Sequence, residues 1–144
     1  MQIREYSEQD LDELRAIHAK QGFGYPLPDL RNPLFISKLV LTERGATDAP
    51  DSRGEKILGA TLLRLTAEAY LLLDPQAGSP RERWQSLQEL HASTERDAWQ
   101  RGLEDVHAWL PPPIAGKFGK HIERLGWVRD DAWTPYCKRL NPGK

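Results

Sequence analysis

The sequence predicts a mixed α/β domain in which a central, mostly antiparallel sheet of about seven strands carries helices on both faces. Three observations support this fold class. Short apolar, strand-like runs alternate with segments of helical periodicity. The two longer helical segments have start and stop signals in the correct order. The length, 144 residues, fits one domain spanning residues 1–144 that folds without a metal or a disulfide.

The first half of the chain begins with a strand and a helix. Ser7 precedes three residues suited to the positive end of a helix dipole. Leu11, Leu14 and Ile17 then form one apolar stripe. Five prolines and glycines in residues 22–33 predict a structured loop. The expected elements are a strand over residues 2–6, a helix between residues 7 and 22, strands over residues 35–42 and 57–65, and a turn over residues 45–54.

The second half contains the clearest helix start in the chain. Ser79 is the expected N-cap, Pro80 the first helical residue, and Glu82 completes a capping box. This helix connects two strands, and such a crossover makes them parallel neighbours. Prolines at positions 111–113 predict the end of the second of these strands. The expected elements are strands over residues 67–73 and 103–110, a helix between residues 79 and 102, a short helix over residues 116–125, and strands over residues 127–129 and 133–140.

Composition narrows the classes of function. The net charge is -1 and the basic residues are scattered, which argues against a nucleic-acid partner, because phosphate binding needs a concentrated basic face. The single cysteine, Cys137, favours the cytoplasm, and the scattered histidines make no metal site. Residues 1–14 do not resemble a signal peptide, and no apolar run approaches the ~20 residues of a membrane helix. We expect a cytoplasmic protein without metal or membrane contact, and the number of tryptophans makes a homodimer worth testing.

Several segments, in order along the chain, resemble the GCN5-related N-acetyltransferase family. They are IREYSEQDL at residues 3–11, LTE at 41–43, EKILGA at 55–60, AYLLLDP at 69–75 and LGW at 125–127. The resemblance implies the acetyltransferase-like fold and an acyl-CoA-dependent N-acyltransferase. Its cofactor would be acetyl-CoA or another acyl-CoA, and its acceptor an amine of a small molecule or peptide.

The resemblance places the cofactor after the fourth strand. In the family, a glycine-rich loop and a helix N-terminus bind the pyrophosphate through backbone N–H groups. The candidate cofactor-binding residues are Leu72, Leu73, Asp74, Gly78, Ser79, Arg81 and Arg83. The second glycine of the loop is missing, and the capping box competes with a phosphate for the same N–H groups. The two arginines can equally be solvated surface charges.

His107, in the middle of the fifth expected strand, is the candidate general base; the alternative is a packed core or interface histidine. The resemblance puts Ile122 where many members carry the tyrosine that protonates the thiolate. The candidate acceptor-site residues are Tyr25, Trp109 and Tyr136, with ordinary core packing as the alternative. Together, the missing glycine and tyrosine favour a second hypothesis, a non-catalytic binding or interaction module that keeps the fold without acyl-CoA chemistry.

Overall fold

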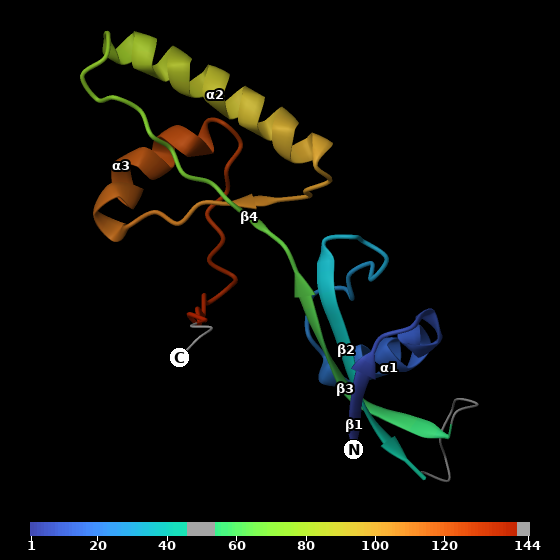
Figure 1. Ribbon diagram of the computed structural model, residues 1–144. Helices are drawn as coiled ribbons and strands as arrows, with labels where there is room; N and C mark the ends of the chain where they lie inside the picture. Colours follow the sequence, from blue (N-terminus) through green and yellow to red (C-terminus); the bar gives the residue numbers. More distant parts are fainter. Residues whose placement is uncertain (46–53, 141–144) are drawn as a thin grey trace. The chain divides into compact units, whose positions relative to one another are not determined.

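The computed structural model describes residues 1–45 and 54–140, and the chain divides into two compact units, Met1–Thr66 and Ala67–Lys144 (Figure 1). The described residues form a mixed α+β protein with three α-helices and five strands, so the predicted class is confirmed in its coarse form. The predicted count of about seven strands is wrong. The organisation as a single domain stays a prediction.

A three-stranded antiparallel sheet, in the order β1-β2-β3, is the framework of the N-terminal unit. The strands are β1 (Gln2–Glu5), β2 (Phe35–Arg44) and β3 (Glu55–Arg64). Val40 and Thr42 lie two positions apart on β2, and Thr42 pairs with Ile57 of β3. All three are buried, so they mark the inner face of the sheet. The predicted antiparallel pairing of these strands is confirmed, while most of the predicted turn over residues 45–54 lies outside the described residues.

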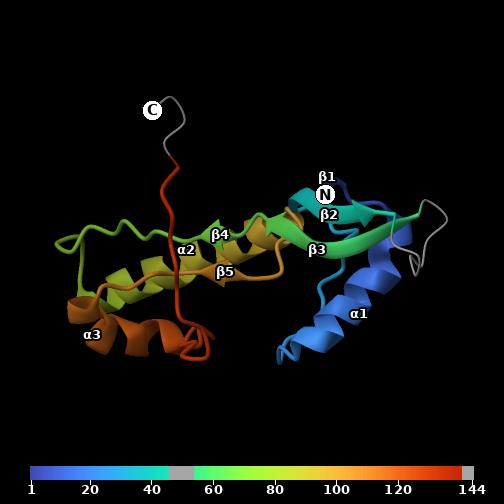
Figure 2. The same ribbon diagram turned by 90° about the horizontal axis from the view of Figure 1, so that it is seen from below.

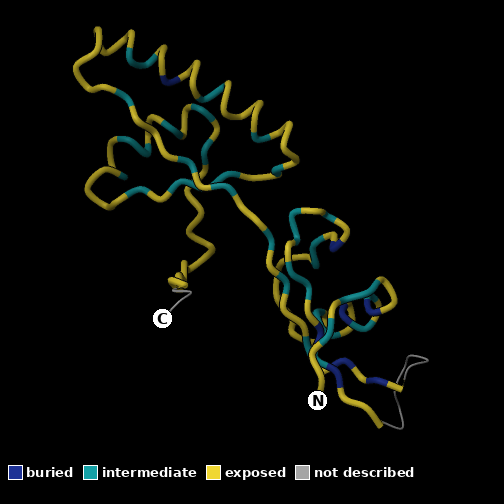
Figure 3. Tube along the Cα trace, in the orientation of Figure 1, coloured by how far each residue is buried: buried dark blue, intermediate teal, exposed yellow. Residues whose placement is uncertain are grey.

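One helix covers this inner face. The chain passes through a single 3-10 turn, η1 (Glu8–Asp10), into α1 (Leu11–Gln21) (Figure 2). Ser7 is the N-cap of η1, and Gly22 ends α1 with a φ of 70°, a conformation that glycine adopts without strain. Leu14 of α1 packs with Leu30, Val40 and Ile57, and these buried residues form the hydrophobic core (Figure 3).

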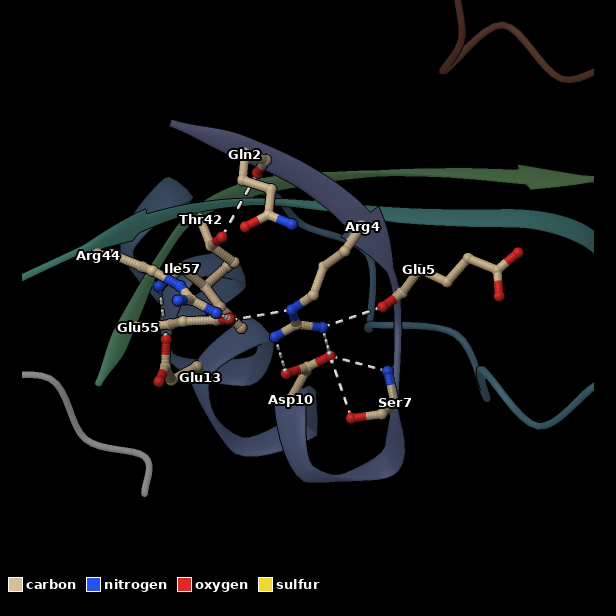
Figure 4. A network of polar contacts seen from close by, with 10 residues as sticks. All are labelled: Gln2, Arg4, Glu5, Ser7, Asp10, Glu13, Thr42, Arg44, Glu55 and Ile57. Atoms are coloured by element: carbon tan, nitrogen blue, oxygen red, sulfur yellow. Dashed lines mark hydrogen bonds and ion pairs between the residues drawn. The ribbon is translucent and has the colours of Figure 1, made fainter. Parts of the chain in front are cut away.

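Arg4 is bound between two buried carboxylates (Figure 4). Its Nη atoms donate to Asp10 at 2.8 and 2.9 Å, and its Nε donates to Glu55 at 2.9 Å. Asp10 is 1% exposed and Glu55 is 4% exposed. The hydrogen bond to Asp10, followed by the one to Glu55, raises the pKa of Arg4. In the same network Glu13 of α1 accepts from the Ile57 amide at 3.0 Å, so polar contacts join β1, η1, α1 and β3.

Tyr6, next to this network, has a buried hydroxyl with no hydrogen-bond partner among residues 1–45 and 54–140. Its ring packs on the core, and Lys38 Nζ lies 5.3 Å from the ring centroid. Burial raises the pKa of the hydroxyl above its ordinary value of 10.0.

We therefore expect Tyr6→Phe to keep or raise the free energy of unfolding at pH 7, by up to about 1 kcal/mol, because an unsatisfied buried hydroxyl is removed. The pKa of Tyr6 is higher in the folded than in the unfolded state. The contribution of this group to wild-type stability is therefore fully present below pH 10 and is lost as the pH rises through the folded-state pKa. Tyr6→Phe should therefore lose less free energy of unfolding between pH 7 and pH 11 than the wild type does. Urea unfolding at pH 7 and pH 11 measures both effects, with Tyr136→Phe, which is 95% exposed, as the control. A loss above about 1 kcal/mol at pH 7 would contradict the expectation.

In the C-terminal unit, a long helix connects two short parallel strands (Figures 1 and 2). The elements are β4 (Ala67–Glu68), α2 (Pro80–Gln100), β5 (Val106–His107) and α3 (Pro112–Glu123). Ala67 pairs with Val106 and Glu68 with His107. The predicted parallel pairing is confirmed, but the strands expected over residues 67–73 and 103–110 keep only two residues each.

The two helices of this unit begin differently from each other. At α2 the predicted capping box is confirmed: the Glu82 amide donates to Ser79 Oγ, and the Ser79 amide donates to the Glu82 carboxylate, both at 3.2 Å. The prediction for α3 is wrong at its start, because the helix begins at Pro112 instead of residue 116. The Ile114 amide already donates to Pro111 O. Proline fits a first helical turn, where its missing N–H removes no hydrogen bond.

The expected closing strands are wrong. Residues 127–140 have no strand pairing within the described part of the chain. An alternating pattern predicts an extended segment, whereas pairing needs an open sheet edge in register. The expected central sheet with helices on both faces is therefore replaced by a three-stranded and a two-stranded sheet. None of the helices in residues 1–45 and 54–140 is long and apolar enough to cross a membrane.

Candidate functional site

The two strands of the C-terminal unit separate after a short pairing. The Ala69 amide donates to His107 O at 2.7 Å, and this is the last backbone hydrogen bond between the two segments among the described residues. Beyond it, residues 70–74 and 108–110 run without regular secondary structure. We call these two diverging segments the strand fork. Each presents backbone N–H and C=O groups, which an extended polar chain can pair with as a further strand would.

A cavity of about 660 Å³ lies beside the strand fork. Its walls come from the fork, from α2, from α3 and from Trp127. Large apolar side chains of the walls include Leu71, Leu73, Leu87, Phe118, Ile122 and Leu125. A cavity of this size, lined mainly by apolar groups with a few polar ones, is typical of small-molecule sites.

Two ring contacts connect the helices around the cavity. Trp127 Nε1 donates to His91 Nε2 at 2.9 Å, so His91 Nε2 is the acceptor and the other ring nitrogen carries the proton. On α2, Glu95 Oε2 lies 4.0 Å from His91 Nδ1. The rings of Trp84 on α2 and His121 on α3 have centroids 5.9 Å apart. These contacts position α2, α3 and the chain after α3 around one cavity.

Polar and aromatic side chains gather where the strands part. The side-chain interaction with the Glu68 carboxylate raises the pKa of the Tyr70 hydroxyl above its ordinary value. In the register, Glu68 stands opposite His107, whose Nε2 lies 3.7 Å from Asp105 Oδ1. The His107 ring stacks on Trp109 with centroids 6.0 Å apart. The His107 side chain is 43% exposed, so its ring is open to solvent.

The structure thus brings two predicted residues, His107 and Trp109, together with three that the sequence analysis did not single out. Those three are Glu68, Tyr70 and Asp105. One available signal was the spacing of two along each strand, which puts Glu68 beside Tyr70 and His107 beside Trp109 on single strand faces.

The predicted phosphate-binding residues bind one another at the start of α2. The capping box occupies the amides of Ser79 and Glu82. Arg83 Nη1 donates to Gly78 O at 2.8 Å, and Arg81 is exposed. Gly78 has a φ of 66°, and the Glu82 carboxylate lies where a Cβ of residue 78 would be. A carboxylate at this place repels a phosphate and takes up the helix-terminal donors that a phosphate would use.

The other predicted residues are distributed more widely. Leu73 is half-buried and lines the cavity, while Leu72 is 92% exposed. Asp74 Oδ1 accepts from a backbone amide in the turn before α2. Tyr136 is 95% exposed in the segment after α3, and Tyr25 belongs to the N-terminal unit, where its ring stacks on Phe23. Within residues 1–45 and 54–140, no group of three or more His, Cys, Asp and Glu side chains could hold a metal ion.

Fold and site define the class of the protein at the level of architecture: a mixed α+β protein with a parallel strand fork beside a mainly apolar cavity. No protein-family model, curated protein or solved structure matches the chain. The resemblance to N-acetyltransferases stays a prediction.

Proposed function

We propose that the C-terminal unit binds an acyl thioester in the strand fork and acts as an acyl-CoA-dependent N-acyltransferase. The observation that carries the proposal is the separation of two parallel strands after two residue pairs, with a cavity beside the gap. The pantetheine arm of CoA is an extended chain with two amides, so it can pair with the unpaired backbone groups of the fork. The order β4, α2, β5, α3 also agrees with the order that the family resemblance implies.

The reaction needs a base but no protein nucleophile. The amine nitrogen attacks the thioester carbonyl, the C–N bond forms as the C–S bond breaks, and the thiolate takes up a proton. His107 or Glu68, which stand opposite each other in the register beside the cavity without lining it, accepts the proton of the attacking amine through water. Backbone N–H groups of the fork stabilise the oxyanion. The proposal includes an amine of a small molecule or peptide as acceptor, a cytoplasmic location and no nucleic-acid partner, with a homodimer as the oligomeric state to test.

A second candidate function is supported by the start of α2. Its N–H groups are capped by Ser79 and Glu82, and Arg83 is bound to Gly78. A non-catalytic module that binds a ligand or partner without CoA chemistry needs no free phosphate site, and this arrangement fits it.

The test is a calorimetric titration with CoA and acetyl-CoA, followed by a thiol-release assay with a panel of primary amines. We expect Glu82→Gln to tighten CoA binding about two- to fivefold, because it removes a negative charge from the helix terminus while its amide oxygen can still cap. Binding of pantetheine, which has no phosphate, should not change. Glu89→Gln, at an exposed position of the same helix, is the matched control. His107→Ala should slow transfer by about 100-fold without weakening CoA binding. No binding at millimolar concentrations would leave the non-catalytic module as the function.

A further inference from the structure

The cavity beside the strand fork is far larger than an acetyl group requires. Its volume is about 660 Å³, within the range of sites that hold whole small molecules, whereas an acetyl group has only three non-hydrogen atoms. Wall residues also remain partly open to solvent: Leu71 is 38% exposed, Leu90 48% and Ile114 50%. Large apolar side chains grouped around one opening are typical of a binding site for an apolar ligand.

The cavity is lined along the length of both helices. On α3 the lining residues from Ile114 to Ile122 recur at helical spacing and cover about 12 Å along the axis. On α2 the lining residues run from Pro80 to Thr94 with the same periodicity. Two such stripes form an elongated apolar surface, which suits a linear chain better than a compact group.

Two polar side chains of the walls already have hydrogen-bond partners within the protein. The His91 nitrogen that could accept a hydrogen bond already accepts from Trp127. Arg83, the charged residue of the lining, donates to a backbone carbonyl. An apolar occupant therefore leaves these two side chains satisfied, while the unpaired backbone groups of the strand fork remain for a polar part of the ligand.

We propose that the acyl group of the donor is an apolar chain of medium length rather than acetyl, and that the cavity between α2, α3 and the strand fork binds it. This inference rests on the proposed acyl transfer. Each buried methylene raises affinity about fourfold at best. An octanoyl group carries six methylenes more than acetyl, so even partial burial gives a large preference.

The experiment is a calorimetric comparison of four probes: CoA, acetyl-CoA, octanoyl-CoA and free octanoate. We expect octanoyl-CoA to bind at least about 50-fold more tightly than acetyl-CoA. Equal affinity for the two thioesters would overturn the chain-length inference and leave acyl transfer standing. Octanoate binding without any CoA binding would support the cavity as an acyl site and reject the transferase. Failure of all four probes to bind rejects both proposals.

A variant that fills the cavity locates the binding. Ile114→Trp should weaken octanoyl-CoA binding at least about tenfold and leave acetyl-CoA binding unchanged, because the half-exposed side chain can grow into the opening without displacing the core. Ile36→Trp, at a 62% exposed position of the N-terminal unit, is the matched control. Ile114→Ala, a change with little folding risk, should reduce octanoyl affinity several-fold. Unchanged octanoyl affinity in both Ile114 variants would overturn the location.

Discussion

Asp10→Ala should lower the free energy of unfolding of the N-terminal unit by about 3 kcal/mol, because the change leaves the guanidinium of Arg4 without its principal partner in a largely buried site. Asp10 accepts two hydrogen bonds from Arg4 and one from the Ser7 amide, at 2.8 to 2.9 Å, and is 1% exposed. The side chain of Arg4 keeps 17% of its exposure, which puts the expected loss at the low end of the range for broken buried ion pairs. Urea unfolding followed by far-ultraviolet circular dichroism measures it.

The matched control is Asp12→Ala, a short distance along the same chain. The Asp12 side chain is 98% exposed and lies 3.6 Å from Arg15, so its ion pair is fully in solvent. Exposed pairs contribute about 0–1 kcal/mol, so this variant should unfold close to the wild type. If Asp10→Ala and Asp12→Ala both lower the free energy of unfolding by the same small amount, the hydrogen bonds of Arg4 do not stabilise the N-terminal unit as their geometry indicates.

The positions of the tryptophans allow the same variant to test the domain organisation. All five tryptophans lie in the C-terminal unit, so tryptophan fluorescence reports on that unit alone. If the chain unfolds as the single domain that its length predicts, Asp10→Ala will shift the fluorescence transition together with the dichroism transition. A shift in the dichroism alone would show that the two units unfold independently.

Leu87→Ala should destabilise the C-terminal unit by about 2 kcal/mol. Leu87, on α2, is the one buried residue in residues 67–140, at 8% exposure (Figure 3). Truncating it removes contacts between α2 and the opposing walls, and the adjacent cavity lets neighbours relax, which favours the lower end of the range for leucine truncation. Urea unfolding followed by tryptophan fluorescence measures the loss.

Leu90→Ala is the control for this prediction. Leu90 is on the same helix but 48% exposed, so less apolar surface is lost and the expected change is below about 1 kcal/mol. Equal losses of unfolding free energy at the two positions would mean that half-exposed residues such as Leu90 stabilise α2 as much as the buried Leu87 does. Addition of octanoyl-CoA should raise the free energy of unfolding of both the wild type and Leu90→Ala, since a ligand that binds only the folded state stabilises it.

Local signals predicted the features that neighbouring residues decide among themselves. The capping box at Ser79 and Glu82 needs only residues three apart, and the stop of α1 needs only a glycine that accepts a φ of 70°. The parallel pairing of β4 and β5 followed from the crossover helix between them. The late predicted start of α3 was a local error, because a proline run can end a strand or begin a helix.

Features that depend on a distant partner were decided by the tertiary structure. The apolar run after β4 and residues 127–140 both suit a strand, but each needs an available sheet edge to pair with, and sequence pattern does not supply one. Arg4 and Glu55 are separated by 51 positions in the sequence, and only the pairing of β1, β2 and β3 in one sheet brings them into contact. The cavity likewise arises from helices and strands that meet only in space. The sequence by itself determined the end of α1 at Gly22, the start of α2 at Ser79 and the order of the elements from β1 to α3. Only the tertiary structure decided that the strands part after Glu68 and His107, because strand length is set by backbone hydrogen bonds between segments far apart in the chain.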